Sequence, residues 1–95
     1  MFYTITIDNY AIFPTQFSVI QTDTSLEFGL YLCEENINTI KKWIAKKTVF
    51  ICISENGGDC TAGNYIIDEK TDDIKQLDKR DGYLDRVITI KFNKE

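Results

Sequence analysis

The side chains that could do chemistry in this 95-residue chain are carboxylates and thiols, because the sequence contains no histidine. Histidine is the usual general base near neutral pH, so its absence removes the Ser-His and Cys-His pairs and the histidine metal sites. Adjacent acids occur at Glu34 and Glu35 and at Asp72 and Asp73. Two carboxylates act on a glycoside only when they face each other across a cleft that tunes their pKa values, and neighbouring acids on exposed loops do not. We therefore expect no catalytic residue and no enzymatic activity.

The cysteines are Cys33, Cys52 and Cys60, an odd number without a CxxC spacing. This pattern indicates neither a zinc site nor a closed disulfide framework, and it favours reduced thiols in a cytosol. A hairpin that turns near Asn56 would place Cys52 almost opposite Cys60, so the sequence leaves open whether these two pair. In an apolar strand, the Cys52 thiol would behave as a small hydrophobic side chain rather than as a nucleophile.

Two loops resemble ligand-binding motifs only in part. Gly57 and Gly58 are not followed by the Lys-Ser/Thr pair of a phosphate-binding loop, and no helix is expected to begin there. The acidic stretch DEKTDD at residues 68–73 lacks the ligand spacing and the distal glutamate of a calcium loop. We therefore expect two solvent-exposed turns, no metal site and no cofactor.

The elements that must position these residues are mostly strands. An amphipathic helix is expected over residues 36–46, with Asn36 as N-cap and Trp43 on the buried face. Residues 48–54 are dense in β-branched side chains, which predicts a strand buried on both faces. Pro14 makes residues 12–14 an edge strand, a bulge or a loop crossing. Strands are expected at residues 2–7, from 17–19 onward, and at 26–33, 48–54, 60–67 and 84–92. The alternation in the last of them turns Ile88, Ile90 and Phe92 inward.

These elements predict a mainly β (α+β) fold, a small antiparallel β-barrel or sandwich of about six strands with one short α-helix. With 43% hydrophobic residues, residues 1–95 are expected to form a single globular domain. The net charge is −4, which argues against general nucleic-acid binding. No apolar run approaches the roughly 18–20 residues that cross a bilayer, and the first residues alternate like a strand rather than a signal peptide. We expect a cytoplasmic protein that does not enter the membrane.

Three surfaces are candidates for contact with other proteins. Gly29 and Tyr31 lie opposite the apolar face of strand 26–33, which suggests that this outer face meets a second subunit. The tip of the expected hairpin and the acidic loop are the other two surfaces. Their residues are Asn56, Gly57, Gly58 and Asp59 for the tip, and Asp68, Glu69, Asp72 and Asp73 for the loop.

The order of features over residues 26–92 resembles the tube proteins of contractile phage tails and of type VI secretion. The matching segments are INTIKKWIAK, VFICISENGG, NYIIDEKTDDIKQL and LDKRDGYLDRVITIKF. The resemblance implies a compact β-barrel with one flanking helix that assembles into stacked hexameric rings. The N-terminal part is shorter than that family usually has, which would give the chain another place in a tail, such as a baseplate, terminator or adaptor.

The expected function is therefore a non-enzymatic protein–protein assembly module, a small bacteriophage virion protein of the tail, tube or baseplate type. Its partners would be other subunits, including copies of itself, and it would be located in the cytoplasm or in a virion. The alternative is a small phage or mobile-element inhibitor that binds a host protein, such as an anti-defence protein of the anti-CRISPR kind. A third interpretation, an enzyme or ligand-binding barrel, would need a cleft with perturbed carboxylates. An oligomer would favour assembly, and a monomer in a one-to-one complex would favour inhibition.

Overall fold

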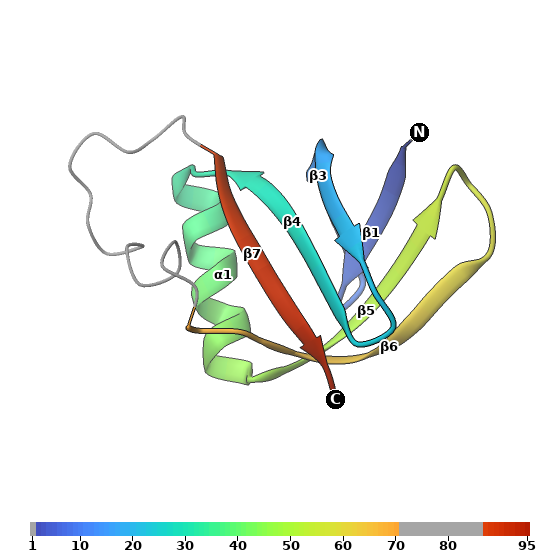
Figure 1. Cartoon of the computed structure of the whole chain (residues 1–95). Coiled ribbons are helices and arrows are strands. Elements are labelled where there is room, and N and C mark those ends of the chain that lie inside the picture. The colour runs from blue at the N-terminus through green and yellow to red at the C-terminus, as the bar shows by residue number, and fades with distance from the viewer. Residues whose placement is uncertain (1, 71–86) are drawn as a thin grey trace.

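The computed structural model describes residues 2–70 and 87–95, which form one antiparallel sheet and one helix (Figure 1). Along the sheet the strands follow the order β2-β1-β5-β6-β7-β4-β3. In chain order the elements are β1 (Tyr3–Ile7), β2 (Tyr10–Ile12), β3 (Thr15–Gln21), β4 (Ser25–Tyr31), α1 (Glu34–Lys46), β5 (Thr48–Glu55), β6 (Cys60–Ile67) and β7 (Val87–Lys94). The predicted mainly β fold with one helix is confirmed. None of the described helical residues form a segment long and apolar enough to span a bilayer.

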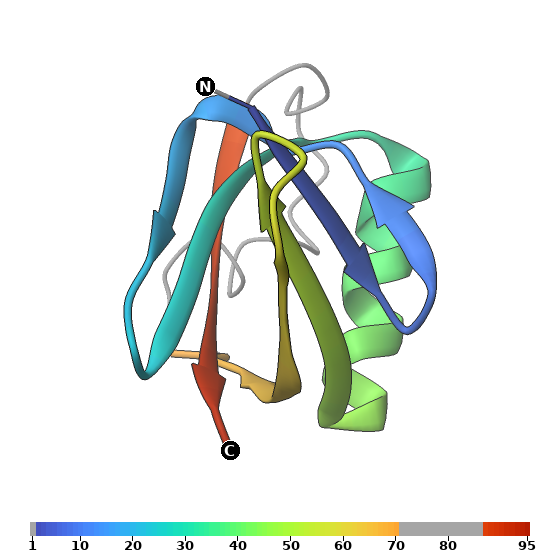
Figure 2. The ribbon, with the colours of Figure 1, turned by 90° about the vertical axis from the view of Figure 1, so that its right-hand side faces the viewer.

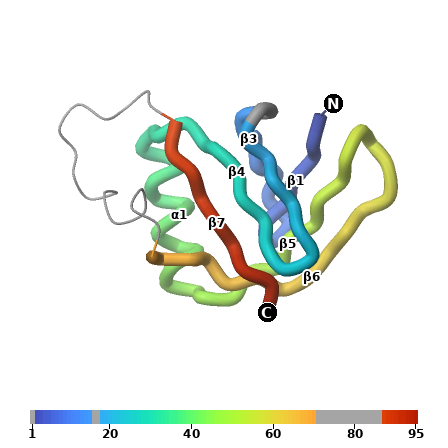
Figure 3. The backbone as a smooth tube through the Cα atoms, in the orientation of Figure 1, coloured from blue at the N-terminus to red at the C-terminus, as the bar shows by residue number. Residues whose placement is uncertain are grey.

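The two edge strands of this sheet, β2 and β3, are consecutive in the chain and are joined only by Phe13 and Pro14. Consecutive Cα atoms are 3.8 Å apart, so Ile12 and Thr15 can lie no more than about 11 Å from each other. The sheet must therefore curve until its edges approach at one end, and Figures 1 and 3 show the β7–β4–β3 side passing in front of β1 and β5. Because β2 and β3 do not pair, the barrel stays open.

The core lies between the concave face of the sheet and α1. On the helix, Trp43 is only 5% exposed. Its ring meets Phe92 edge-on with centroids 5.5 Å apart, and Phe92 stacks on Phe28 at 5.8 Å. These contacts confirm the predicted buried position of Trp43 and the inward face of the last strand. The buried hydrophobic residues of the described strands are Ile5, Ile7, Leu26, Phe28, Leu30, Val49, Ile51, Ile53, Tyr65, Ile67, Ile88, Ile90 and Phe92.

Two tight turns are made by the residue types that tolerate positive φ. Asp8 and Asn9 have φ values of 51° and 71°, and Asn56 and Gly57 have values of 53° and 73°. Positive φ at both central residues is the requirement of a type I′ hairpin turn. In the second turn the Gly58 N–H donates to the Glu55 carbonyl at 2.9 Å. The hairpin predicted at residues 56–59 is confirmed.

Three local predictions were wrong. The helix begins at Glu34 rather than at 36, and its N-cap is Cys33, which makes no side-chain capping hydrogen bond. Asn36 lies inside the first turn, where its amide donates back to the Tyr31 carbonyl at 2.7 Å. The strand at residues 48–54 is buried on one face only, because α1 covers the concave side and leaves Phe50 44% exposed. Residues 10–12 form a further edge strand, β2, so the described sheet has seven strands, in line with the predicted mainly β fold of about six strands.

Candidate functional site

A groove of about 1130 Å³ separates α1 from the β1–β2 hairpin. Figure 2 shows β2 running beside α1 at this edge of the sheet. The floor includes Ile7, Leu30 and Trp43, whose side chains belong to the core. One wall is the β2 edge, formed by Tyr10, Ala11, Ile12 and Phe13, and the other is a stripe on α1 formed by Glu35, Asn38, Thr39, Lys42 and Lys46.

The helix wall follows from the spacing of its residues. Positions 35, 38, 39, 42 and 46 recur every three or four residues, so their side chains share one face of α1. Ile37, Ile40 and Trp43 are the buried residues of the helix and turn toward the core. The groove therefore has a polar wall on the helix and an apolar wall on the strand.

The apolar wall carries two aromatic residues that are largely exposed. Among the large hydrophobic side chains that the structure describes, Phe13 and Tyr10 have the highest exposed fractions, at 85% and 77%. Single exposed apolar residues are common on protein surfaces, but apolar groups that gather beside a groove mark an interaction site. Aromatic side chains are also enriched among the residues that dominate binding energy at interfaces.

The backbone of β2 is available on its outer side. Within residues 2–70 and 87–95, β2 pairs with β1 alone, with Ile7 opposite Tyr10 and Ile5 opposite Ile12. In an antiparallel hairpin the hydrogen-bonded pairs alternate, and the pair that flanks a two-residue turn is bonded. The N–H and C=O of Ala11 therefore point away from β1. Such unpaired groups on an edge strand are a template for pairing with another chain.

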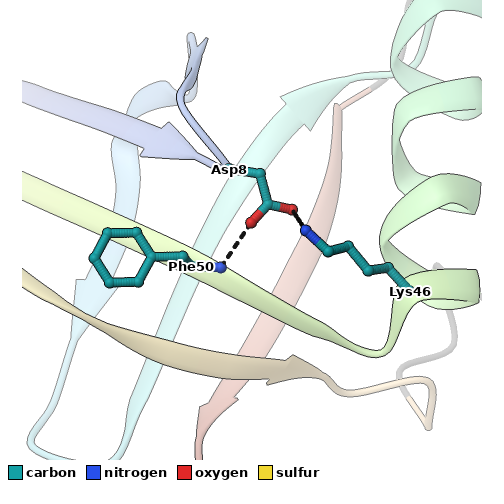
Figure 4. A network of polar contacts seen from close by, with 3 residues as sticks. All are labelled: Asp8, Lys46 and Phe50. Carbon is teal, nitrogen blue, oxygen red and sulfur yellow. Dashed lines mark hydrogen bonds and ion pairs between the residues drawn. The ribbon is translucent and has the colours of Figure 1, made fainter.

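One end of the groove is held together by Asp8, in the turn between β1 and β2 (Figure 4). One carboxylate oxygen accepts a hydrogen bond from Lys46 Nζ at 2.8 Å, and the other accepts the Phe50 N–H at 2.9 Å. The Asp8 N–H donates to the Phe50 carbonyl at 2.8 Å. Partial burial raises the pKa of Asp8, but the bonds from Lys46 and Phe50 and the charge of Lys46 outweigh it and lower the pKa below its ordinary 3.8. The ionised carboxylate thus ties the hairpin to α1 and β5.

The remaining charges of the groove lie on α1. Lys46 is engaged by Asp8, which leaves Lys42 and Glu35 as the other charged lining residues. These two side chains are seven positions apart, so they lie two turns apart on the same face, about 10 Å along the axis. The groove is therefore positive near the Asp8–Lys46 end and negative near the start of the helix.

The predicted interface residues lie apart from the groove. Gly29 is buried on its outer side by β3, because the Thr15 and Ser18 hydroxyls approach it closely and Ser18 Oγ accepts the Gly29 N–H at 2.8 Å. Tyr31 is 59% exposed on the outer face, opposite the exposed Val87 of β7. The structure thus leaves Tyr31, but not Gly29, accessible to a partner.

The predicted hairpin tip is exposed but bonded to the N-terminal strand. The Asn56 N–H donates to the Phe2 carbonyl, and Asn56 Oδ1 accepts the Phe2 N–H, both at 2.8 Å. The Ser54 hydroxyl donates to the Gly58 carbonyl at 2.8 Å. Gly57, Gly58 and Asp59 are exposed.

In the acidic loop, Asp68 is half-buried and Glu69 is exposed. The hydrogen bond from the Lys70 N–H is the main cause that lowers the pKa of Asp68; partial burial opposes it, and the Asn93 amide and nearby lysines add to the lowering. The Asp68 carboxylate therefore fixes the start of the loop by accepting these hydrogen bonds. Asp72 and Asp73 lie outside the described residues, so their prediction stays open.

The three cysteines are unpaired thiols in the structure. Cys52 lies opposite Ala62 and Cys60 opposite Ser54, so these two cysteines are diagonal rather than direct neighbours across β5 and β6. Desolvation, followed by the charge and hydrogen bonding of Cys52, raises the pKa of Cys60. A raised pKa keeps the Cys60 thiol protonated near neutral pH and makes it a weak nucleophile. The described residues also contain no group of three or more side chains placed to hold a metal ion.

Sequence reasoning missed the groove, because its walls come from segments whose packing is not a local property. Tyr10 stood out only as one of five tyrosines, and Phe13 only as a neighbour of the proline. The usable signal was an aromatic residue directly before Pro14 at an expected sheet edge.

Comparisons with protein-family models, with curated proteins and with solved structures find no match for this chain.

Proposed function

We propose that this chain is a non-enzymatic protein–protein assembly module that acts as a small structural subunit. The observation that carries the proposal is the outer edge of β2, which no other described strand pairs with and where Tyr10 and Phe13 project beside the groove. Small-molecule sites enclose roughly 300–1000 Å³ and bury most of their ligand. A larger groove with one open strand edge and exposed aromatic residues suits a polypeptide better than a small substrate.

The chemistry of the groove supports a binding role over catalysis. Asp8 is held ionised by Lys46 and the Phe50 N–H, whereas a general acid needs a proton to donate near neutral pH. Glu35, the other lining carboxylate, lies on the exposed surface of the helix.

The outer face of β4 offers a second surface, through which copies of the chain would associate. Tyr31 and Val87 are directly opposite each other on neighbouring strands and are both exposed. The resemblance of residues 26–92 to contractile-tail tube proteins supports a specific form of this proposal, a bacteriophage virion subunit of the tail, tube or baseplate type. Such a subunit is made in the cytoplasm and ends in the virion.

The second candidate is a small phage or mobile-element inhibitor of a host protein, in the manner of an anti-defence protein. It is favoured by the groove itself, because one groove is enough for a one-to-one complex and requires no second copy. The two candidates predict different molar masses for the isolated protein in solution, since only the assembly subunit associates with itself.

The test is the molar mass in solution, measured by size exclusion with light scattering over a range of concentrations. We expect a mass above the 11.0 kDa of one chain that rises with concentration. Tyr31→Glu should return it to that of a single chain, because a charge at the centre of an apolar contact must be desolvated. Phe13→Glu adds the same charge at an exposed aromatic residue of the groove, so it reports whether copies associate through the β2 edge instead.

A wild-type protein that stays a single chain at every concentration would contradict self-assembly and favour the inhibitor. An oligomer that only Phe13→Glu dissociates would move the contact between copies from the outer face of β4 to the β2 edge.

A further inference from the structure

The groove is asymmetric in three ways that together describe what it binds. Its strand wall presents the aromatic rings of Tyr10 and Phe13 and the backbone N–H and C=O of Ala11, which bond to no other strand in the part of the chain that the structure describes. Its helix wall presents Lys42 near one end and Glu35 near the other. A bound chain must therefore form hydrogen bonds with a strand edge, contact an apolar surface and bring a negative charge to a positive one.

From this arrangement we propose that the groove binds an extended segment of a different protein, which adds as a strand to β2 and places a carboxylate beside Lys42. The inference rests on the proposed protein-binding function and names the class of partner. Strand addition takes its affinity from main-chain hydrogen bonds and its specificity from alternate side chains. Apolar residues at alternate positions of the segment contact Tyr10, Ile12 and Phe13.

The charge of α1 supplies the argument for an acidic partner. Lys42 and Lys46 are the exposed lysines of the groove's helix wall, and α1 has no acid after Glu35. Asp8 engages Lys46 at 2.8 Å, whereas Lys42 has no ion pair among the described residues. A chain with a net charge of −4 thus presents a local positive surface at this end of the groove.

The same charges argue against a second copy paired strand to strand. The β2 strand consists of Tyr10, Ala11 and Ile12 and carries no acid. A β2–β2 pair would therefore bring no carboxylate from that strand to Lys42.

The test uses two blocked heptapeptides that alternate valine and threonine, one with a central glutamate and one with a central lysine. Each is titrated into the ¹⁵N-labelled full-length protein, and amide shifts are followed by NMR. We expect the glutamate peptide to bind more tightly and to shift the Ala11 amide. Lys42→Glu should weaken it by roughly three- to tenfold, as expected for reversing one exposed charge contact, and should strengthen the lysine peptide.

Two further variants separate the contribution of the Lys42 charge from that of the β2 backbone. Lys47→Glu makes the same charge change at an exposed lysine that does not line the groove, so both peptides should keep their wild-type affinity within about twofold. Ala11→Pro removes an N–H that faces solvent, a change that edge strands tolerate. It should abolish peptide binding while the protein keeps its thermal unfolding temperature.

The inference is overturned if folded Ala11→Pro binds the peptides as the wild type does, if both peptides bind equally, or if a helical alanine-rich peptide with the same glutamate binds better. Absence of peptide binding from a protein that self-associates by light scattering overturns this inference and leaves the proposed assembly function standing. Glutamate-selective binding by a protein that remains a single chain supports the inference and favours the inhibitor over the assembly subunit.

Discussion

Replacing Gly29 by alanine tests whether the outer face of β4 is filled by the chain's own edge strand. A Cβ at this position would lie 2.6 Å from Ser18 Oγ, 2.8 Å from Thr15 Oγ1 and 2.9 Å from Val87 Cγ1. All three distances are shorter than real Cβ contacts. The neighbours cannot move aside cheaply, because Ser18 Oγ accepts the Gly29 N–H, donates to the Thr15 carbonyl at 3.0 Å and also bonds the Thr15 hydroxyl.

The magnitude follows from two opposing terms. Overpacking of this kind costs about 1–3 kcal/mol. The loss of glycine's freedom in the unfolded chain returns about 0.4–1 kcal/mol. We expect Gly29→Ala to lower the free energy of unfolding by about 1–2 kcal/mol, or roughly 4–8 °C in Tm for each kcal/mol in a domain of this size.

Gly63→Ala is the matched control, because Gly63 also lies within a strand but has room for a side chain. A Cβ there would meet Lys94 Cε at 3.5 Å and Tyr65 Cε1 at 3.8 Å, which are ordinary contacts. This variant should be neutral or stabilised by up to about 1 kcal/mol. Urea unfolding followed by Trp43 fluorescence measures the free energy of unfolding of both variants. If Gly29→Ala is as stable as Gly63→Ala, the packing of β3 on Gly29 is refuted.

Three further predictions concern the core, a turn and the groove clamp. Trp43→Ala should lower the free energy of unfolding by about 3–5 kcal/mol, and a loss near zero by circular dichroism would contradict its buried position. Asn56→Ala should lose roughly 1–2 kcal/mol more than Asn56→Gly, because φ is 53° and only alanine is strained there; equal Tm values would contradict this. Asp8→Asn should lose roughly 0.5–1 kcal/mol at pH 7, since amide replaces the carboxylate that binds the half-exposed Lys46. The lowered pKa of Asp8 means that its contribution is complete above its ordinary value of 3.8 and is lost as the pH falls below it. The stability difference between the wild type and Asp8→Asn should therefore shrink in acid, and a constant difference from pH 7 to pH 2 would contradict the ion pair.

The sequence was informative wherever structure depends on nearby residues. Alternating apolar residues predicted the inward side chains Ile88, Ile90 and Phe92, and the Asn56-Gly57 pair predicted its turn. Trp43 was expected in the core from helical spacing and lies there. In each case a local period or a local φ requirement decides the outcome.

The remaining features depend on pairing between distant segments. The pattern of residues 48–54 could not show that α1 covers only one face of β5, which leaves Phe50 exposed. The pattern of residues 26–33 could likewise not show that β3 folds over Gly29, since the register between β3 and β4 shifts after Thr15. The groove arises in the same way, because it exists only once the β2 edge and α1 are placed beside each other. Its proposed binding role thus rests on tertiary structure rather than on a motif.

The strand order also determines when the sheet can be completed during synthesis. The central strands β5, β6 and β7 come later in the chain than the two hairpins that flank them in the sheet. Ile5 can therefore pair only after Ile53 has been synthesised, and Leu30 can pair with β7 only after Ile88 has been synthesised. Until β7 leaves the ribosome, β4 has only β3 beside it, and the apolar residues Leu26, Phe28 and Leu30 lack their partners. Pairings so distant in sequence form slowly and leave strand edges open to aggregation in the meantime. The nascent chain therefore exposes the apolar face of β4 to aggregation until β7 emerges.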